Sequence, residues 1–184
     1  MNLKDYPELQ AAILAMPQKK KDSLLFRLIR KDKLLVEQLH FRLLEGQDDL
    51  NKRTQELKNT IRLSLSDKKE AIKSASTSTG FKILNSTFRN LHGQIGHHEK
   101  VTRDLLSDVD CRIYTILLLF ENYPEYFGKT LLTIGERFHK YVLGRVTHLL
   151  KKYDKLHEDY QFDFYEDILF IQNFATEIGE SEAK

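Results

Sequence analysis

Two segments of the sequence place a glutamate three positions before a histidine. These residues are Glu37 and His40 in one segment and Glu136 and His139 in the other. Residues three apart on an α-helix share a face, so each pair would present a carboxylate and an imidazole to the same metal ion. The four residues are therefore candidate metal ligands.

Two such pairs together with two further glutamates form the di-iron centre of ferritin-like helical bundles. Glu8, Glu70 and Glu99 are available for these two positions, and their spacing singles out none of them. His139 also falls within an apolar stripe, which fits either an inward-pointing ligand or a buried histidine hydrogen-bonded to the protein. Outside this arrangement the sequence predicts no cofactor.

A second polar group lies near the middle of the chain and consists of His92, His97, His98, Asp104, Asp108 and Cys111. Its nitrogen, oxygen and sulfur atoms would suit a mixed metal-ligand set. The spacing also fits ordinary ion pairs between residues four apart, Asp108 with Arg112 and Glu99 with Arg103, on a solvated helix face. The second interpretation is the simpler one.

Basic residues follow one side of two long predicted helices, over residues 48–73 and 129–155. Such faces bind phosphates without sequence preference, so the candidate nucleic-acid-binding residues are Lys58, Arg62, Lys69, Lys73, Arg137, Lys140, Lys151 and Lys155. The alternatives are a solvated face and pairing with the acidic residues near the end of the sequence. A membrane surface fits less well, because the apolar stripe beside the first basic face is narrow and has no aromatic residues.

Apolar residues surround most of the last predicted helix, which is expected to begin at Asp163 and to end at Gly179. A helix of this kind is either deep in a core or partly reserved for a partner. If a partner is bound, Phe164, Phe170 and Phe174 are the candidate interface residues.

The common catalytic motifs are missing from the sequence. It has no P-loop, no G-x-G-x-x-G, no G-x-S-x-G and no H-E-x-x-H. A single cysteine, Cys111, rules out an intramolecular disulfide, and no apolar run approaches the roughly 20 residues that span a bilayer. These features favour a cytoplasmic protein that is not an enzyme and has no membrane partner.

The spacing of apolar residues predicts helices almost everywhere, and eight glycines and three prolines are too few for a sandwich or barrel. We expect an all-α fold of about seven or eight helices, in a bundle or a short HEAT-like stack. A helix opens at Pro7 and closes at Pro17, and two more are predicted over 22–30 and 32–45, or one continuous helix. Further helices are predicted over 48–73, 81–95, 98–122 and 129–155, with 98–122 as the central one.

Charge divides the chain into two halves. Residues 1–92 hold 18 basic and 11 acidic residues, whereas residues 93–184 hold 11 basic and 16 acidic residues. The second half also holds most of the aromatic residues. We therefore expect a basic, leucine-rich half over 1–73, a Ser/Thr-rich loop over 74–80, and an acidic, aromatic-rich half over 81–184, which can also pack as one domain.

The missing motifs and the opposite charges of the two halves favour an interaction or scaffold protein with a protein partner, or one that self-associates. A nucleic-acid-associated protein is the first alternative, and a ferritin-like metal-binding bundle is the second.

Overall fold

The computed structural model describes residues 3–183, with side chains through residue 179. Within this range the chain forms α-helices and two short 3-10 helices, and no strand. The all-α prediction is therefore confirmed. The chain divides into two compact units, Met1–Glu45 and Gly46–Lys184.

The first unit contains the 3-10 helix η1 (Leu3–Asp5) and the helices α1 (Pro7–Ala15), α2 (Gln18–Ile29) and α3 (Lys33–Leu44). Pro7 occupies the first turn of α1, as predicted, because its missing N–H needs no partner there. Asp32 caps α3 by accepting a 3.1 Å hydrogen bond from the backbone N of Leu35. The predicted start at Asp22 is wrong, because α2 already begins directly after Pro17.

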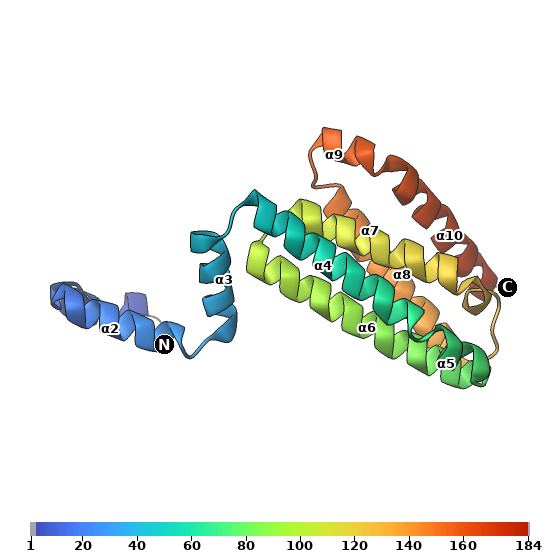
Figure 1. Ribbon diagram of the computed structural model, residues 1–184, viewed down its shortest axis with the longest axis horizontal. Helices are drawn as coiled ribbons and strands as arrows, with labels where there is room; N and C mark the ends of the chain where they lie inside the picture. Colours follow the sequence, from blue (N-terminus) through green and yellow to red (C-terminus); the bar gives the residue numbers. More distant parts are fainter. Residues whose placement is uncertain (1–2, 184) are drawn as a thin grey trace. The chain divides into compact units, whose positions relative to one another are not determined.

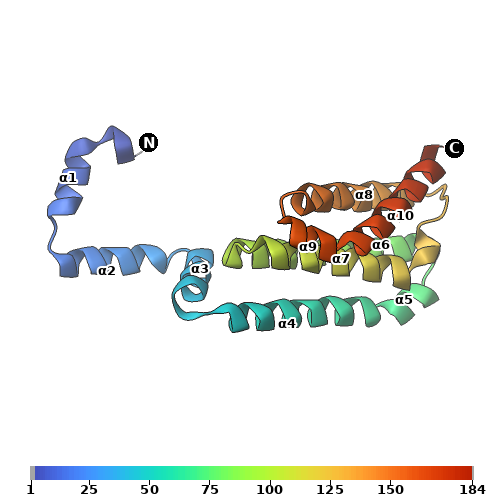
Figure 2. The same cartoon turned by 90° about the horizontal axis from the view of Figure 1, so that it is seen from above.

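The second unit is a helical bundle. It contains α4 (Gln47–Ser66), α5 (Lys69–Ser74), α6 (Thr77–Thr102), α7 (Leu105–Asn122), the 3-10 helix η2 (Pro124–Tyr126), α8 (Thr133–Tyr153), α9 (Glu158–Asp163) and α10 (Tyr165–Ala183). Helix α7 contacts each of the other four long helices of this unit, α4, α6, α8 and α10, and is therefore the central helix (Figures 1 and 2). Its buried residues, among them Ile116 and Leu119, belong to one continuous core.

The start of this central helix differs from the prediction. Helix α6 continues through Gly93 and Gly96 as far as Thr102, where the prediction ended one helix and began the next at His98. The buried side chains of Ile95 and Val101 hold this stretch in the core, so packing outweighs the low helix propensity of glycine. The break comes at Arg103, whose φ of 55° is left-handed, and Asp104 then caps α7.

The Ser/Thr-rich segment 74–80 is not a loop between two halves. Ser74 ends α5, and Ser76 caps α6 by accepting a hydrogen bond from the backbone N of Thr79. The chain divides instead between Glu45 and Gly46, a position that the composition did not indicate. The predicted single helix over 48–73 is also interrupted, between Ser66 and Lys69.

Helices α6 and α8 lie side by side and run in the same direction. Phe88 packs edge-to-face on Tyr141 with ring centroids 5.9 Å apart, and farther along Glu99 forms an ion pair with Lys152. Both pairs join residues that are 53 positions apart in the sequence. The same offset therefore relates facing residues of the two helices over several turns.

Replacing glycine by alanine is expected to have opposite effects on stability at two positions of α6. A Cβ at Gly80 would lie 2.7 Å from Cζ of the buried Tyr126, whereas a Cβ at Gly93 would have nothing within 4 Å. We expect Gly80→Ala to lower the free energy of unfolding by about 1–3 kcal/mol through overpacking. Gly93→Ala should raise it by about 0.5–1 kcal/mol, since alanine loses less backbone entropy in a helix. Urea unfolding of both variants checks this, and equal signs would contradict it.

No helix in the described part of the chain is both long and apolar enough to cross a membrane.

Candidate functional site

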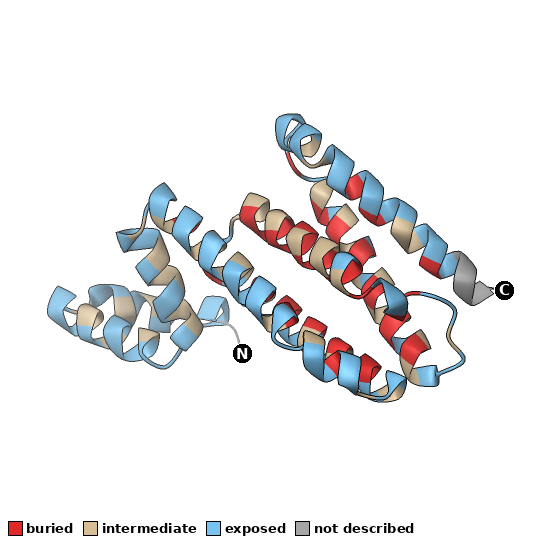
Figure 3. Cartoon of the chain, turned by 45° about the vertical axis from the view of Figure 1, so that its right-hand side comes forward, coloured by how far each residue is buried: buried red, intermediate tan, exposed pale blue. Residues whose placement is uncertain are grey.

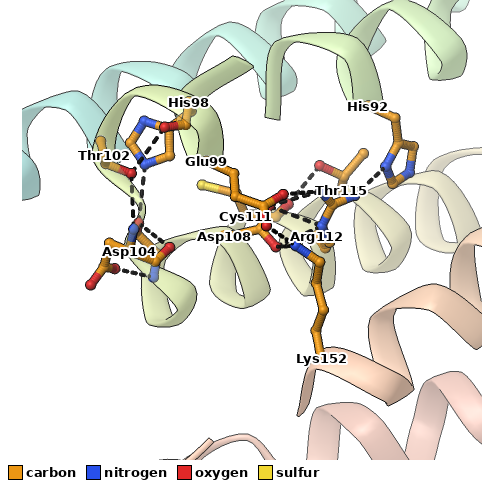
Figure 4. Close-up of polar contacts among 11 residues, drawn as sticks. His92, His98, Glu99, Thr102, Asp104, Asp108, Cys111, Arg112, Thr115 and Lys152 are labelled. Carbon is orange, nitrogen blue, oxygen red and sulfur yellow. Dashed lines mark hydrogen bonds and ion pairs between the residues drawn. The ribbon is translucent and has the colours of Figure 1, made fainter. Parts of the chain in front are cut away.

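Three helices of the second unit bring a cluster of charged side chains into the core. Asp108 of α7 has no exposed surface. Its carboxylate accepts hydrogen bonds from Nε of Arg112 at 2.9 and 3.0 Å and from Nζ of Lys152 of α8 at 2.7 Å (Figure 4). One buried carboxylate thus holds two cations from two helices.

Glu99 of α6 supplies the second carboxylate of this cluster. It forms an ion pair with Lys152 and accepts a 3.4 Å hydrogen bond from Nη2 of Arg112. The Glu99 side chain is 38% exposed, so the cluster reaches solvent on this side. The charges of the two carboxylates and the two cations cancel, and the four side chains together join α6, α7 and α8.

His92 of α6 borders the cluster. Its Nδ1 lies 3.3 Å from Nη1 of Arg112, and its ring packs edge-to-face on Phe88. Burial, followed by the positive charges of Arg112 and Arg145 and by His148, lowers the pKa of His92 to about 3. The imidazole is therefore neutral at physiological pH.

The chemistry available to these groups is limited by their mutual pairing. Each carboxylate of the cluster already accepts hydrogen bonds from two cations. Cys111, the neighbouring thiol, is fully buried, and burial raises its pKa to about 12. A thiol in this state is a poor nucleophile. The cluster fits a structural role better than a catalytic one.

The sequence predicted one ion pair of this cluster but placed it on a solvated helix face. Asp108 and Arg112 do form the expected pair four residues apart, but the pair is buried and not on a solvated face. Glu99 contacts Arg112 and Lys152. Lys152 was missed, although it lies three residues after the buried Leu149 and so continues the apolar stripe of α8, which separates it from the exposed Lys151 beside it.

The two candidate pairs of metal ligands lie in different units of the chain. Glu37 and His40 belong to α3 of the first unit, and Glu136 and His139 belong to α8 of the second. His40 pairs with Glu45 at 2.8 Å. Within residues 3–179, no group of three or more His, Cys, Asp or Glu side chains is arranged to hold a metal ion.

His139 matches the second interpretation offered for it. Its imidazole is buried, and its Nε2 lies 2.6 Å from the backbone carbonyl oxygen of Tyr126. The rings of Phe81 and Phe127 pack against it. The contacts of His139 are those of a core histidine that is hydrogen-bonded to the protein.

The candidate phosphate-binding residues divide into two groups. Lys58 forms a 2.7 Å ion pair with Asp110 and lies over the ring of Tyr114, and Lys69 donates a 3.4 Å hydrogen bond to Asn122. The other six are exposed: Arg62, Lys73, Arg137, Lys140, Lys151 and Lys155. Nucleic-acid binding by these basic residues stays a prediction.

The three phenylalanines proposed as an interface have different surroundings. Phe174 is half-buried and stacks on Phe120 with centroids 4.2 Å apart, and Phe164 is also half-buried. Phe170 is 47% exposed, and Phe162 of the preceding helix is 83% exposed. The last helix is therefore part of the core on one face and carries exposed apolar side chains on another.

No protein-family model, curated protein or solved structure matches the chain.

Proposed function

We propose that the chain is a non-enzymatic interaction protein of the cytosol. The first unit binds a protein partner, and the second unit is the folded helical bundle to which the first unit is joined. One observation carries the proposal. None of residues 3–45 is buried (Figure 3), although this stretch has many large apolar side chains. The exposed ones are Leu3, Tyr6, Leu9, Leu14, Leu25, Phe26, Leu28, Val36, Leu43 and Leu44.

A unit of this kind has little to stabilise it alone. Isolated helices shorter than about 12–15 residues are marginal in water. Chains of about 40 residues usually need a metal, disulfides or association to fold. Covering the apolar faces of α2 and α3 would contribute about 25 cal/mol for each Å² removed from water. A protein surface that covers them therefore gives this unit the core that it lacks.

A second copy of the chain is the partner that the charges favour. Helix α2 carries Leu25 and Leu28 beside a run of three lysines at residues 19–21. Helices α9 and α10 carry the exposed Phe162 and Phe170 among acidic residues, four of which lie in the first turns of these helices. Opposite charge beside complementary apolar surface favours association and makes it sensitive to salt.

Self-association can be measured by light scattering of the full chain at low and high salt. We expect a dimer at low salt that weakens as the ionic strength rises. The double variant Leu25→Glu, Leu28→Glu should be monomeric under both conditions. Leu131→Glu is the matched control, because Leu131 is a 93% exposed leucine of the second unit and its replacement should leave the dimer intact. A wild-type chain that is monomeric throughout would rule out the second copy as partner.

A further inference from the structure

The polar contacts between α6 and α8 continue beyond the buried ion cluster. The offset of 53 positions that relates Phe88 to Tyr141 and Glu99 to Lys152 also places Arg145 level with His92. Electrostatics agrees with this placement, because the charge of Arg145 is among the causes that lower the pKa of His92. The two side chains therefore lie at the same level of the seam between the helices.

Each of these two side chains has a buried nitrogen without a hydrogen-bond partner in the described part of the chain. The atoms are Nε2 of His92 and Nε of Arg145. The guanidinium of Arg112 can only donate, so Nδ1 of His92 accepts from it and Nε2 of the neutral ring carries the proton. Both unpartnered atoms are therefore N–H donors. His92 itself is only 7% exposed.

Unpaired donors of this kind are costly. Leaving a buried donor without an acceptor costs about 1–3 kcal/mol, and more for a charged group. Most buried polar atoms in proteins have a partner, which for a site between helices is a protein group, an ordered water or a ligand. Each of the two donors therefore needs an acceptor, and a ligand at this level of the seam could receive both.

The surroundings of the two donors carry excess positive charge. Arg89 and Arg145 both lie over the ring of Tyr141, with Cζ 4.1 and 5.4 Å from its centroid. Within the described residues neither arginine forms an ion pair, whereas Arg112 and Lys152 are neutralised by Asp108 and Glu99. A ligand that accepts hydrogen bonds here would therefore also meet two uncompensated positive charges.

We propose that the seam between α6 and α8 binds an oxyanion of the phosphate class at His92 and Arg145. The Nε2–H of His92 and the Nε–H of Arg145 donate to its oxygens, and Arg89 adds a second positive charge. A tetrahedral oxyanion has several acceptor oxygens, so one ion can receive donors from two helices. The same chemistry would hold free phosphate or the phosphoryl group of a larger ligand. This proposal does not depend on the proposed protein partner.

Thermal unfolding of the full chain tests the proposal with inorganic phosphate as the probe. The wild-type melting temperature should rise with phosphate concentration, relative to sodium chloride at the same ionic strength. Arg145→Gln should weaken phosphate binding at least tenfold. Arg137→Gln is the matched control, since it removes the same charge from an exposed position on the same helix and should bind like the wild type. Equal melting temperatures of the wild type in the two salts would overturn the proposal, as would equal phosphate binding by the two variants.

A second measurement does not depend on a variant that folds. Nitrogen-15 NMR of the wild-type histidine side chains should show the Nε2–H signal of His92 moving on addition of phosphate, while that of the exposed His97 stays in place. Repeating the titration with glycerol 3-phosphate separates the two sources: tighter binding than inorganic phosphate points to the phosphoryl group of a larger ligand, and weaker binding points to the free ion. A His92 signal that moves with neither ligand would overturn the proposal.

Discussion

Asp108→Ala is expected to lower the free energy of unfolding by about 3–5 kcal/mol. The carboxylate of Asp108 is fully buried and neutralises part of the charge of Arg112 and Lys152, which are themselves buried. Removing it leaves two cations in the core with the partly exposed Glu99 as their only carboxylate in the cluster. The cost is that of buried charge without a partner, in addition to the loss of two ion pairs. Urea unfolding monitored by circular dichroism measures it.

The neighbouring Asp110 offers a matched control on the same helix. It pairs with Lys58 at 2.7 Å, and both side chains of this pair are partly exposed. Because water screens such a pair, Asp110→Ala should cost only about 0–1 kcal/mol. Similar urea midpoints for the two variants would contradict this expectation. They would show that burial does not change the contribution of the aspartate to the free energy of unfolding.

His92 is expected to make the fold sensitive to mild acid. Its pKa is about 3 in the folded chain and 6.5 in the absence of perturbation, so the unfolded chain takes up the proton first. The contribution of the neutral ring to stability is complete above pH 6.5 and is lost as the pH falls toward 3. The loss amounts to about 1.4 kcal/mol for each pH unit in this window.

The variant His92→Gln isolates this effect, because glutamine keeps an acceptor for Arg112 but does not titrate. We expect the free energy of unfolding of the wild type to fall more steeply than that of the variant between pH 6 and pH 4.5, by about 1.4 kcal/mol for each pH unit. The measurement is made in chloride buffer without phosphate. His97→Gln replaces an exposed histidine of the same helix and should follow the wild type. Parallel curves for the wild type and His92→Gln would show that His92 does not titrate in unfolding.

Helices were more predictable than the contacts between them. The positions of Pro7, Asp32 and Pro17 locate helix ends because capping and proline geometry are local properties. The ion cluster depends on a lysine 44 positions from its aspartate. Periodicity within one helix states which residues share a face, but it does not state which residue of another helix faces them.

Composition failed to locate the division of the chain for a related reason. Serine and threonine are favoured in loops and also as helix caps, so the segment 74–80 fits both a boundary and the start of a helix. Ser76 has the second role. The division after Glu45 depends instead on whether apolar residues reach a shared core, which is a property of the folded chain.

The single thiol of the chain has a practical consequence. Cys111 lies on the central helix with no exposed surface, and burial holds its sulfur in the protonated form. A thiol-specific reagent therefore reaches it only when α7 separates from its neighbours. The rate at which this sulfur is alkylated therefore reports how often the bundle opens. No label has to be engineered into the protein for this measurement.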